Sequence, residues 1–283
     1  PSLHRCFMDW SPSTRSDFLS GGSRLTESPE SDGAKNFADL WCDPTQPTPD
    51  LLVVLASTRT AEQQGISAAG CTPAARRTTA LADAELLLNG PSVPPLWPLP
   101  PLPAGVSPAL ISWVVCQQLG LDPQVAALGL TVPPHFPHLR FEDPCCGPGE
   151  CVSSGAAMSS SRVLQLLQRG RRLGQRLRRP LVLAECVPGG TTTALAVLTG
   201  LGLPVQTLVS GSALHPPMEL KQRLVSEGLS HLAWDRPVDA VSLLAAVGDP
   251  FQALATGLLL GVLDSDQTVL LAGGSQMAAV LGL

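Results

Sequence analysis

The chain has 283 residues, of which 44% are hydrophobic and only 14% are charged, and its formal net charge at pH 7 is −5. This length and apolar content suffice for a large α/β domain with a buried core. A general nucleic-acid-binding protein would be basic, so the negative charge argues against nucleic acid as a partner.

No targeting or membrane segment is visible in the sequence. Residues 1–13 lack a continuous apolar region of the kind found in secretory signals. The apolar stretch 251–263 is interrupted by polar residues and is too short to cross a bilayer. The eight cysteines lack the close spacing of a disulfide framework, which favours reduced thiols. We therefore expect a cytoplasmic protein with no membrane partner.

The first half of the chain predicts a polar N-terminal region followed by the start of an α/β domain. Residues 1–48 are rich in Ser, Pro and Asp with weak periodicity, so the domain is expected over 49–283. Thr72 and Pro73 are typical of the start of a helix, here expected over 72–88. The proline-rich stretch 91–108 predicts a connecting loop, with an SH3-type ligand as the alternative. The other expected elements are strands at 51–56 and 124–130 and a helix from Ser107-Pro108 to Leu119.

The second half of the chain alternates strand and helix patterns. The helix expected over 163–177 ends in an arginine-rich stretch, 169–179, which is typical of a solvated helix end; a phosphate or nucleic-acid patch is the alternative. Strands are expected at 181–186, 205–210 and 268–272, and helices at 191–202, 218–232, 238–246, 251–263 and from Ser275, which can cap the last helix. This alternation predicts a doubly wound, mostly parallel sheet with flanking helices and a smaller helical part.

Two strand-to-helix connections share one design. LVLAEC-VPGG-TTT and TVLLA-GG-SQM each lead from a buried strand through two glycines to hydroxyl side chains that begin a helix. A helix N-terminus after such a turn presents free N–H groups that favour phosphate, and Thr191, Thr192 and Thr193 can add donors. A tight turn with a threonine cap is the alternative. Because neither the Walker lysine nor a G-x-G-x-x-G motif is present, a single phosphomonoester fits better than a triphosphate or dinucleotide.

Two further groups of residues can carry chemistry. Glu185 lies at the end of a predicted strand beside the first turn. A carboxylate there can accept a hydrogen bond from a sugar hydroxyl or a heterocycle N–H, or act as a base; pairing with an arginine or capping a helix is the alternative. The cluster HFPHLRFEDPCCGPGEC offers His135, His138 and three cysteines to zinc. Its spacing lacks two clean ligand pairs, so a loop with incidental thiols is the favoured interpretation.

Five stretches together resemble one enzyme family. They are GISAAGCTPAARRTTALADAELL (65–87), PLPAGVSPALIS (101–112), AECVPGGTTTALAVLTGLG (184–202), AAVGDPFQALATGLLLG (245–261) and LLAGGSQMAAV (270–280). The chain resembles the cyanobacterial and archaeal branch related to nicotinate-nucleotide–dimethylbenzimidazole phosphoribosyltransferase of cobalamin biosynthesis. The resemblance implies transfer of ribose phosphate from nicotinate mononucleotide to a benzimidazole-like base. It also implies a homodimer that uses no metal and no cofactor.

The resemblance also implies site residues. Glu185 is the expected catalytic carboxylate, and the segment Gly65–Ser67, with Ser67, is expected near the acceptor base together with Ser107. The residues expected to bind the nucleotide are Gly189, Gly190, Thr191, Thr192, Thr193, Gly248, Asp249, Gly273 and Gly274.

One departure from the family leaves a second function open. Family members usually continue past the position of Leu283, and the general-base glutamate of the bacterial enzyme lies in that continuation. Glu185 therefore does not simply inherit the role of base. The alternative function is a non-catalytic relative that binds the nucleotide or the base, and a third hypothesis is a zinc-dependent hydrolase that uses the His/Cys cluster.

Overall fold

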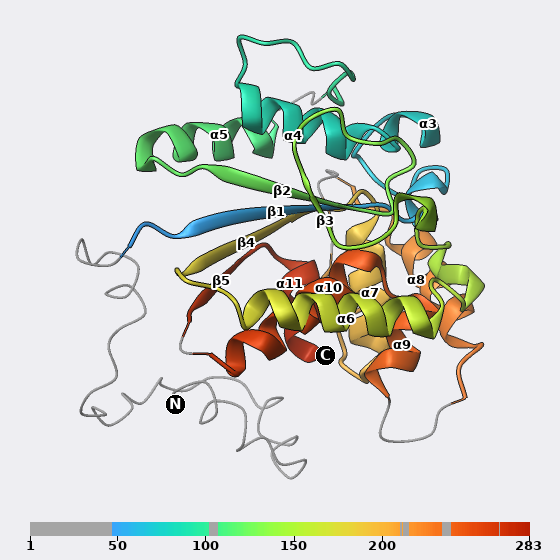
Figure 1. Cartoon of the computed structure of the whole chain (residues 1–283). Helices are drawn as coiled ribbons and strands as arrows, with labels where there is room; N and C mark the ends of the chain where they lie inside the picture. Colours follow the sequence, from blue (N-terminus) through green and yellow to red (C-terminus); the bar gives the residue numbers. More distant parts are fainter. Residues whose placement is uncertain (1–46, 102–106, 210, 212–214, 234–238, 266) are drawn as a thin grey trace, which may run out of the picture. The chain divides into compact units, whose positions relative to one another are not determined.

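The computed structural model describes residues 47–101, 107–209, 211, 215–233, 239–265 and 267–283 (Figure 1). Thr48–Leu283 form one compact unit. The polar region expected over 1–48 lies almost wholly outside the described residues. Among the helices that are described, none is long and apolar enough to span a membrane.

A five-stranded parallel sheet organises this unit. The strands are β1 (Asp50–Ala56), β2 (Pro123–Leu128), β3 (Leu139–Arg140), β4 (Leu181–Cys186) and β5 (Val269–Ala272), in the order β3-β2-β1-β4-β5. The chain runs outward from β1 to β3 and then returns to β4 on the other side of β1. The strand order therefore reverses between β1 and β4, and ligands of such sheets bind beyond the strand ends at this point. The expected doubly wound α/β fold is confirmed.

Strand β1 shows why this sheet lies in the interior. Its residues from Leu51 to Ala56 are all buried. Leu52, Val54 and Ala56 pack into the larger hydrophobic cluster, whereas the alternate residues pack into a smaller cluster on the opposite face. A continuous apolar run is typical of a parallel strand that is covered on both faces.

Three helices cover the face of the smaller cluster: α3 (Pro73–Arg76), α4 (Thr79–Asn89) and α5 (Pro108–Leu119) (Figure 1). Thr72 caps α3, since its Oγ1 accepts from Ala75 N over 3.1 Å. The prediction of a single helix over 72–88 is wrong, because a break at Arg77–Thr78 separates α3 from α4. Thr78 donates its hydroxyl to Ala75 O and becomes the N-cap of α4 with a φ of −114°.

The remaining helices lie on the opposite side of the sheet (Figure 1). They are α6 (Ser160–Gly174), α7 (Gly190–Gly200), α8 (Met218–Leu229), α9 (Ala240–Val247), α10 (Pro250–Leu263) and α11 (Ser275–Gly282); short 3₁₀ helices are η2 (Arg59–Glu62), η3 (Pro144–Cys146) and η4 (Val152–Ser154). At the basic end of α6, Arg171 pairs with Asp264 over 2.8 Å and is exposed, as the interpretation of a solvated helix end predicts.

Helices α6 and α10 cross with their backbones in contact. A Cβ atom added at Gly170 would lie 2.1 Å from Leu254 O, and one at Gly257 would lie 2.1 Å from Leu167 O. Real Cβ atoms do not approach a carbonyl oxygen so closely, so the two glycines let the helices approach. Close packing against α6 therefore buries one side of α10.

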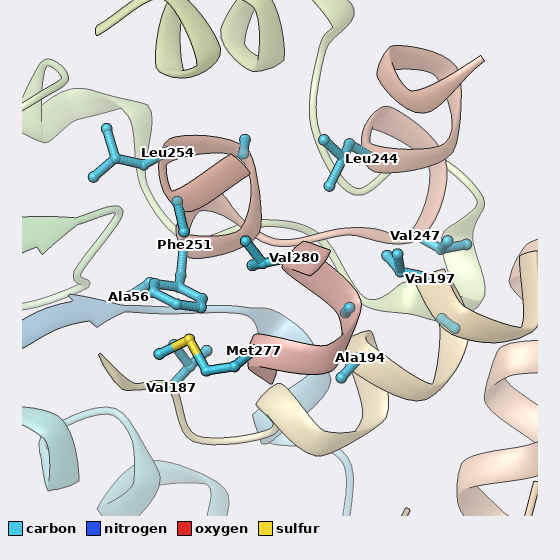
Figure 2. Packing of buried hydrophobic residues seen from close by; sticks show 14 of the residues in the cluster. Ala56, Val187, Ala194, Val197, Leu244, Val247, Phe251, Leu254, Met277 and Val280 are labelled. Carbon is cyan, nitrogen blue, oxygen red and sulfur yellow. The ribbon is translucent and has the colours of Figure 1, made fainter. Parts of the chain in front are cut away.

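The helix expected over 251–263 forms as α10, and most of it is buried. Phe251, Leu254 and Leu258 are at most 1% exposed. Figure 2 shows Phe251 pointing toward Ala56 at the end of β1, with Met277 of α11 beside it. Most of α10 therefore belongs to the core, although Leu260 and Leu263 near its end are exposed.

Two smaller expectations are also wrong. The described part of 205–210 contains turns and no strand, because Leu208 N bonds to Val205 O within the segment and Leu208 is 75% exposed. Ser275 does not cap α11; the N-cap is Gly274, and no side chain bonds there.

Candidate functional site

The turn after β4 lies at the point where the strand order reverses. Gly189 is the N-cap of α7 and has a φ of 82°, a conformation that favours glycine. A Cβ atom at this position would lie 2.9 Å from Ala61 N, in the segment that follows β1. The loops after β1 and β4 therefore meet at the sheet edge where a ligand is expected.

The second glycine turn lies at the same edge. Strands β4 and β5 are neighbours, with Ala184 opposite Ala272, and Gly273 and Gly274 follow β5 directly. Gln276 in the first turn of α11 reaches across to α7, since a Cβ atom at Gly190 would lie 2.6 Å from Gln276 Nε2. The two turns are thus adjacent, and Gly274 has open space beside it.

Asp249 links the helices behind these turns. It is fully buried and accepts hydrogen bonds from Thr193 Oγ1 over 2.5 Å and from Gln276 Nε2 over 2.7 Å. It also caps α10 by accepting from Gln252 N over 3.0 Å. These partners give Asp249 a framework role between α7, α10 and α11, and contact with a ligand stays a prediction. Gly248 ends α9 in contact with Leu244, one residue away from this network.

The three threonines of the turn have different surroundings. Thr192 is fully buried, and Thr193 donates to Gly190 O over 3.0 Å in addition to Asp249. Thr191 is only partly buried and accepts a hydrogen bond from Lys221 Nζ over 2.8 Å. Among the three hydroxyls, that of Thr191 is therefore the one placed beside a cation.

Lys221 of α8 is the functional candidate that sequence reasoning missed. Its side chain is 1% exposed, and burial lowers its pKa to about 8. A Cβ atom at Gly211 would lie 3.3 Å from its Nζ and 3.6 Å from Thr191 Oγ1, so a glycine leaves space beside this pair. A signal was present in the sequence: Lys221 precedes Leu224 and Val225 at the spacing of the buried face of α8, where a lysine is unusual.

Glu185 lies next to the last residue of β4, opposite Val54 of β1. Its side chain is partly buried. Burial, together with the nearby charge of Asp249, raises its pKa to about 7, although the backbone N–H of Val187 opposes the shift. At neutral pH its protonated and ionised forms are therefore present in similar amounts. Such a carboxyl can exchange a proton under physiological conditions.

Ser107 lies near the end of β4, on the face of the sheet that the smaller hydrophobic cluster covers. It caps α5 by accepting from Ala109 N, and its hydroxyl donates to Asp83 Oδ1 over 2.8 Å. The other carboxylate oxygen of Asp83 lies 3.7 Å from the thiol of Cys186, the neighbour of Glu185. Burial raises the pKa of Asp83. The structure therefore connects Ser107 to the end of β4 through Asp83, which sequence reasoning did not identify.

Ser67 lies in a loop that Arg76 of α3 holds in place through hydrogen bonds. Its Oγ accepts from Ala69 N over 3.1 Å. Arg76, which is 3% exposed, donates to the backbone oxygens of Gly70, Ala61 and Gln63 over 2.6–2.9 Å. Because Ala61 also contacts the turn at Gly189, Arg76 joins the loop that carries Ser67 to the β4 side of the site.

The described part of the chain contains no set of ligands for the zinc site that the sequence left open. There, no group of three or more His, Cys, Asp or Glu side chains is arranged to hold a metal ion. His135 instead lies 3.3 Å from Glu85, and His138 contacts the backbone oxygen of Phe136. Cys145 and Cys146 are exposed free thiols in η3.

A protein-family model matches the part of the chain that contains both glycine turns. The family model described as "Phosphoribosyltransferase" matches residues 109–283, which include α7, α8 and both glycine turns. The chain belongs to this phosphoribosyltransferase family. The resemblance inferred from the sequence is thereby confirmed at the level of the family.

Two cyanobacterial relatives extend the comparison along the chain. A UPF0284 protein of Prochlorococcus marinus (strain MIT 9313) is 64% identical over 82% of this chain and 58% of its own length. The UPF0284 protein SYNW1869 of Parasynechococcus marenigrum (strain WH8102) is 60% identical over 86% of this chain and 61% of its own length. The chain thus spans about three fifths of the length of these relatives, whose names state no activity.

Solved structures share the fold. The crystal structure of CobT from Thermus thermophilus has a TM-score of 0.60 and 18% identity, over 83% of this chain and 65% of that one. A structure of nicotinate-nucleotide-dimethylbenzimidazole phosphoribosyltransferase from the same organism has a TM-score of 0.59 and 18% identity, over 83% of this chain and 64% of that one. At this identity the likeness establishes the architecture alone.

Proposed function

We propose that this chain transfers phosphoribose from nicotinate mononucleotide to a benzimidazole-like base. The observation that carries the proposal is the pair of Lys221 and Thr191 beside the turn Gly189–Gly190, 2.8 Å apart at the N-terminus of α7. An ammonium, a hydroxyl and a helix N-terminus together suit one phosphate group. One cation matches a monophosphate better than a triphosphate.

Glu185 is the proposed catalytic carboxylate. In the reaction the bond between ribose C1′ and the nicotinate nitrogen breaks, and its electron pair stays on the pyridine nitrogen. C1′ gains positive charge until a ring nitrogen of the acceptor bonds to it, and the acceptor then loses its N–H proton to water. An ionised Glu185 at the end of β4 would stabilise the charge that develops at C1′. Its pKa of about 7 leaves a large ionised fraction at neutral pH.

We assign the acceptor base to the neighbourhood of Ser67 and Ser107. Ser67 lies in the loop fixed by Arg76, and Ser107 is hydrogen-bonded to Asp83. The proposed product is an α-ribazole phosphate, and the proposed role is assembly of the lower ligand of cobalamin. A homodimer and a cytoplasmic location are parts of the same proposal.

Nicotinate release measures this activity directly. Purified chain is incubated with nicotinate mononucleotide and either dimethylbenzimidazole or adenine, and nicotinate is quantified by HPLC. We expect acceptor-dependent release that Glu185→Gln reduces at least 10-fold, whereas the matched variant Glu219→Gln, on the exposed start of α8, keeps the wild-type rate. Melting temperatures of both variants control for folding.

The binding of nicotinate mononucleotide separates the two candidate functions. Tight binding without nicotinate release would favour a non-catalytic nucleotide-binding relative. Absence of both binding and turnover would reject the nucleotide site itself. An unchanged rate in Glu185→Gln would remove Glu185 from the mechanism while leaving the phosphate site to be tested through Lys221.

A further inference from the structure

Asp83 of α4 is a partly buried carboxyl group whose partners are neutral. It lies on the side of the sheet that the smaller hydrophobic cluster covers (Figure 1). Among the described residues it contacts the hydroxyl of Ser107 and the thiol of Cys186, and no Lys, Arg or His pairs with it. Burial raises its pKa. A carboxyl group kept from water without a cation is more typical of a functional site than of a structural ion pair.

The Asp83 carboxylate can accept further hydrogen bonds. A carboxylate offers about four lone-pair sites, of which the Ser107 hydroxyl uses one, and a thiol is only a weak donor. Asp83, Ser107 and Cys186 are all partly exposed, so a molecule at the strand ends can reach this group. The carboxylate therefore has both the capacity and the access to bind a donor from a ligand.

Helix α4 brings Asp83 to the two serines expected near the acceptor base. Thr79 donates its hydroxyl to Ala69 O, in the loop that carries Ser67. Thr79 and Asp83 are four residues apart and so lie on the same face of α4. Ser107 is bonded to Asp83 directly. One face of α4 thus connects both serines, with the carboxylate on it.

Asp83 and Glu185 approach the end of β4 from opposite faces of the sheet. Cys186, which contacts Asp83, packs with the smaller hydrophobic cluster, and its neighbour Glu185 points the other way because side chains alternate along a strand. Leu130 and Phe136 of the same cluster follow β2 and offer apolar surface to a flat ring beyond this sheet edge. A ring on the α4 side would therefore find a carboxylate and an apolar surface.

We propose that Asp83 accepts a hydrogen bond from the N–H group of the acceptor base and thereby selects and orients it. This inference rests on the proposed function. In a benzimidazole or a purine, the five-membered ring carries one N–H group and one nitrogen with a free lone pair. Holding the N–H at Asp83 turns the other nitrogen away from α4, toward the ribose carbon on the Glu185 side. Ser107 fixes the carboxylate that does this.

Two probes of the same shape test the role of Asp83. Benzoxazole keeps the free ring nitrogen of benzimidazole and has an oxygen in place of the N–H group. Binding of each probe is measured by calorimetry and by chemical-shift changes in isotope-labelled chain. We expect the wild type to bind benzimidazole at least about 10-fold more tightly, because benzoxazole loses a hydrogen bond to a charged group. Asp83→Ala should reduce this ratio to about 2-fold or less, and Asp83→Asn, which keeps a neutral acceptor oxygen, to an intermediate value.

The matched control is Asp122→Ala, which removes an exposed carboxylate just before β2, at the opposite edge of the sheet. It should keep the wild-type ratio. Because both probes are compared within one variant, a loss of folded protein does not by itself change the ratio, and melting temperatures verify folding.

Three results would overturn the proposal: equal binding of the two probes to the wild type, an unchanged ratio in Asp83→Ala, or no benzimidazole binding at millimolar concentration. The outcome is separate from that of the transferase assay. Discrimination between the probes without nicotinate release would reject the transferase and keep the base site. Nicotinate release with equal binding of both probes would reject the role of Asp83 alone.

Discussion

Lys221 Nζ donates a hydrogen bond to Thr191 Oγ1 over 2.8 Å, although the two residues are 30 positions apart on different helices. Lys221 is held by the buried face of α8, and Thr191 is held by the turn that follows β4. The contact brings a cation to a glycine turn that contains no lysine of its own. In the proposed phosphate site, tertiary packing would therefore supply the cation that a Walker motif supplies within a single loop.

Removing this cation should weaken nucleotide binding. We expect Lys221→Met to reduce the affinity for nicotinate mononucleotide about 10- to 100-fold, because a charge-assisted hydrogen bond to phosphate is lost. In the wild type the affinity should fall as pH rises past about 8, since the ammonium deprotonates there and must be reprotonated to bind phosphate. Calorimetry from pH 6.5 to 9.5 measures both effects.

The matched control for that prediction is Arg223→Met, which removes an exposed cation two residues further along α8. It should bind the nucleotide like the wild type. An equal loss in both variants would indicate a general effect of charge, and a flat pH profile in the wild type would exclude Lys221 as the phosphate ligand.

The sheet and the glycine turns were predictable because they depend on local patterns. The run LLVVLA has the composition of a strand buried on both faces, and β1 occupies it with one additional residue. The paired glycines after β4 and β5 follow from the sequence alone. Because both strands are parallel neighbours, their turns had to share an edge.

The polar contacts behind the turns were not predictable in the same way. The sequence shows Asp249 only as part of a Gly-Asp-Pro break between two predicted helices. Its burial depends on α7 and α11 arriving with Thr193 and Gln276. The strand predicted over 205–210 is wrong because Val205 and Leu208 have strand-like side chains, but the segment forms a turn in which Leu208 is exposed.

Asp249 offers a prediction about stability. We expect Asp249→Asn to lower the free energy of unfolding by about 1–3 kcal/mol, because the new amide group would face donors from Thr193 and Gln276. Urea denaturation at pH 7 measures the change. Asp239→Asn is the control: it also caps a helix, α9, but is exposed, and asparagine is an equally good cap. Equal effects of the two variants would contradict the framework role of Asp249.

The crossing of α6 and α10 offers a second prediction about stability. Gly170→Ala should lower the free energy of unfolding by at least about 2 kcal/mol, because the methyl group would lie 2.1 Å from Leu254 O and the helices must separate. Gly149→Ala is the matched control, since its nearest new contact would be 3.5 Å and ordinary. Thermal unfolding of the two variants compares them. A smaller loss for Gly170→Ala than for Gly149→Ala would show that the helices do not touch as described.

Glu185 should make stability depend on pH. Its pKa rises from the ordinary 4.5 to about 7 in the folded chain, because burial and the charge of Asp249 disfavour ionisation. Between these values the folded state binds more protons than the unfolded state, so the free energy of unfolding falls as pH rises. The full loss corresponds to about 3 kcal/mol.

Glu185→Gln isolates this contribution, since glutamine keeps the shape and cannot ionise. We expect wild type and variant to have similar stability near pH 4.5, and the variant to become progressively more stable than the wild type up to about pH 8. Asp249 is present in both chains, so its own titration largely cancels in the difference. Urea denaturation at half-unit pH steps gives that difference directly. If it stayed constant from pH 4.5 to 8, Glu185 would titrate normally and the carboxyl would lie in water instead of in the site between β1 and β4.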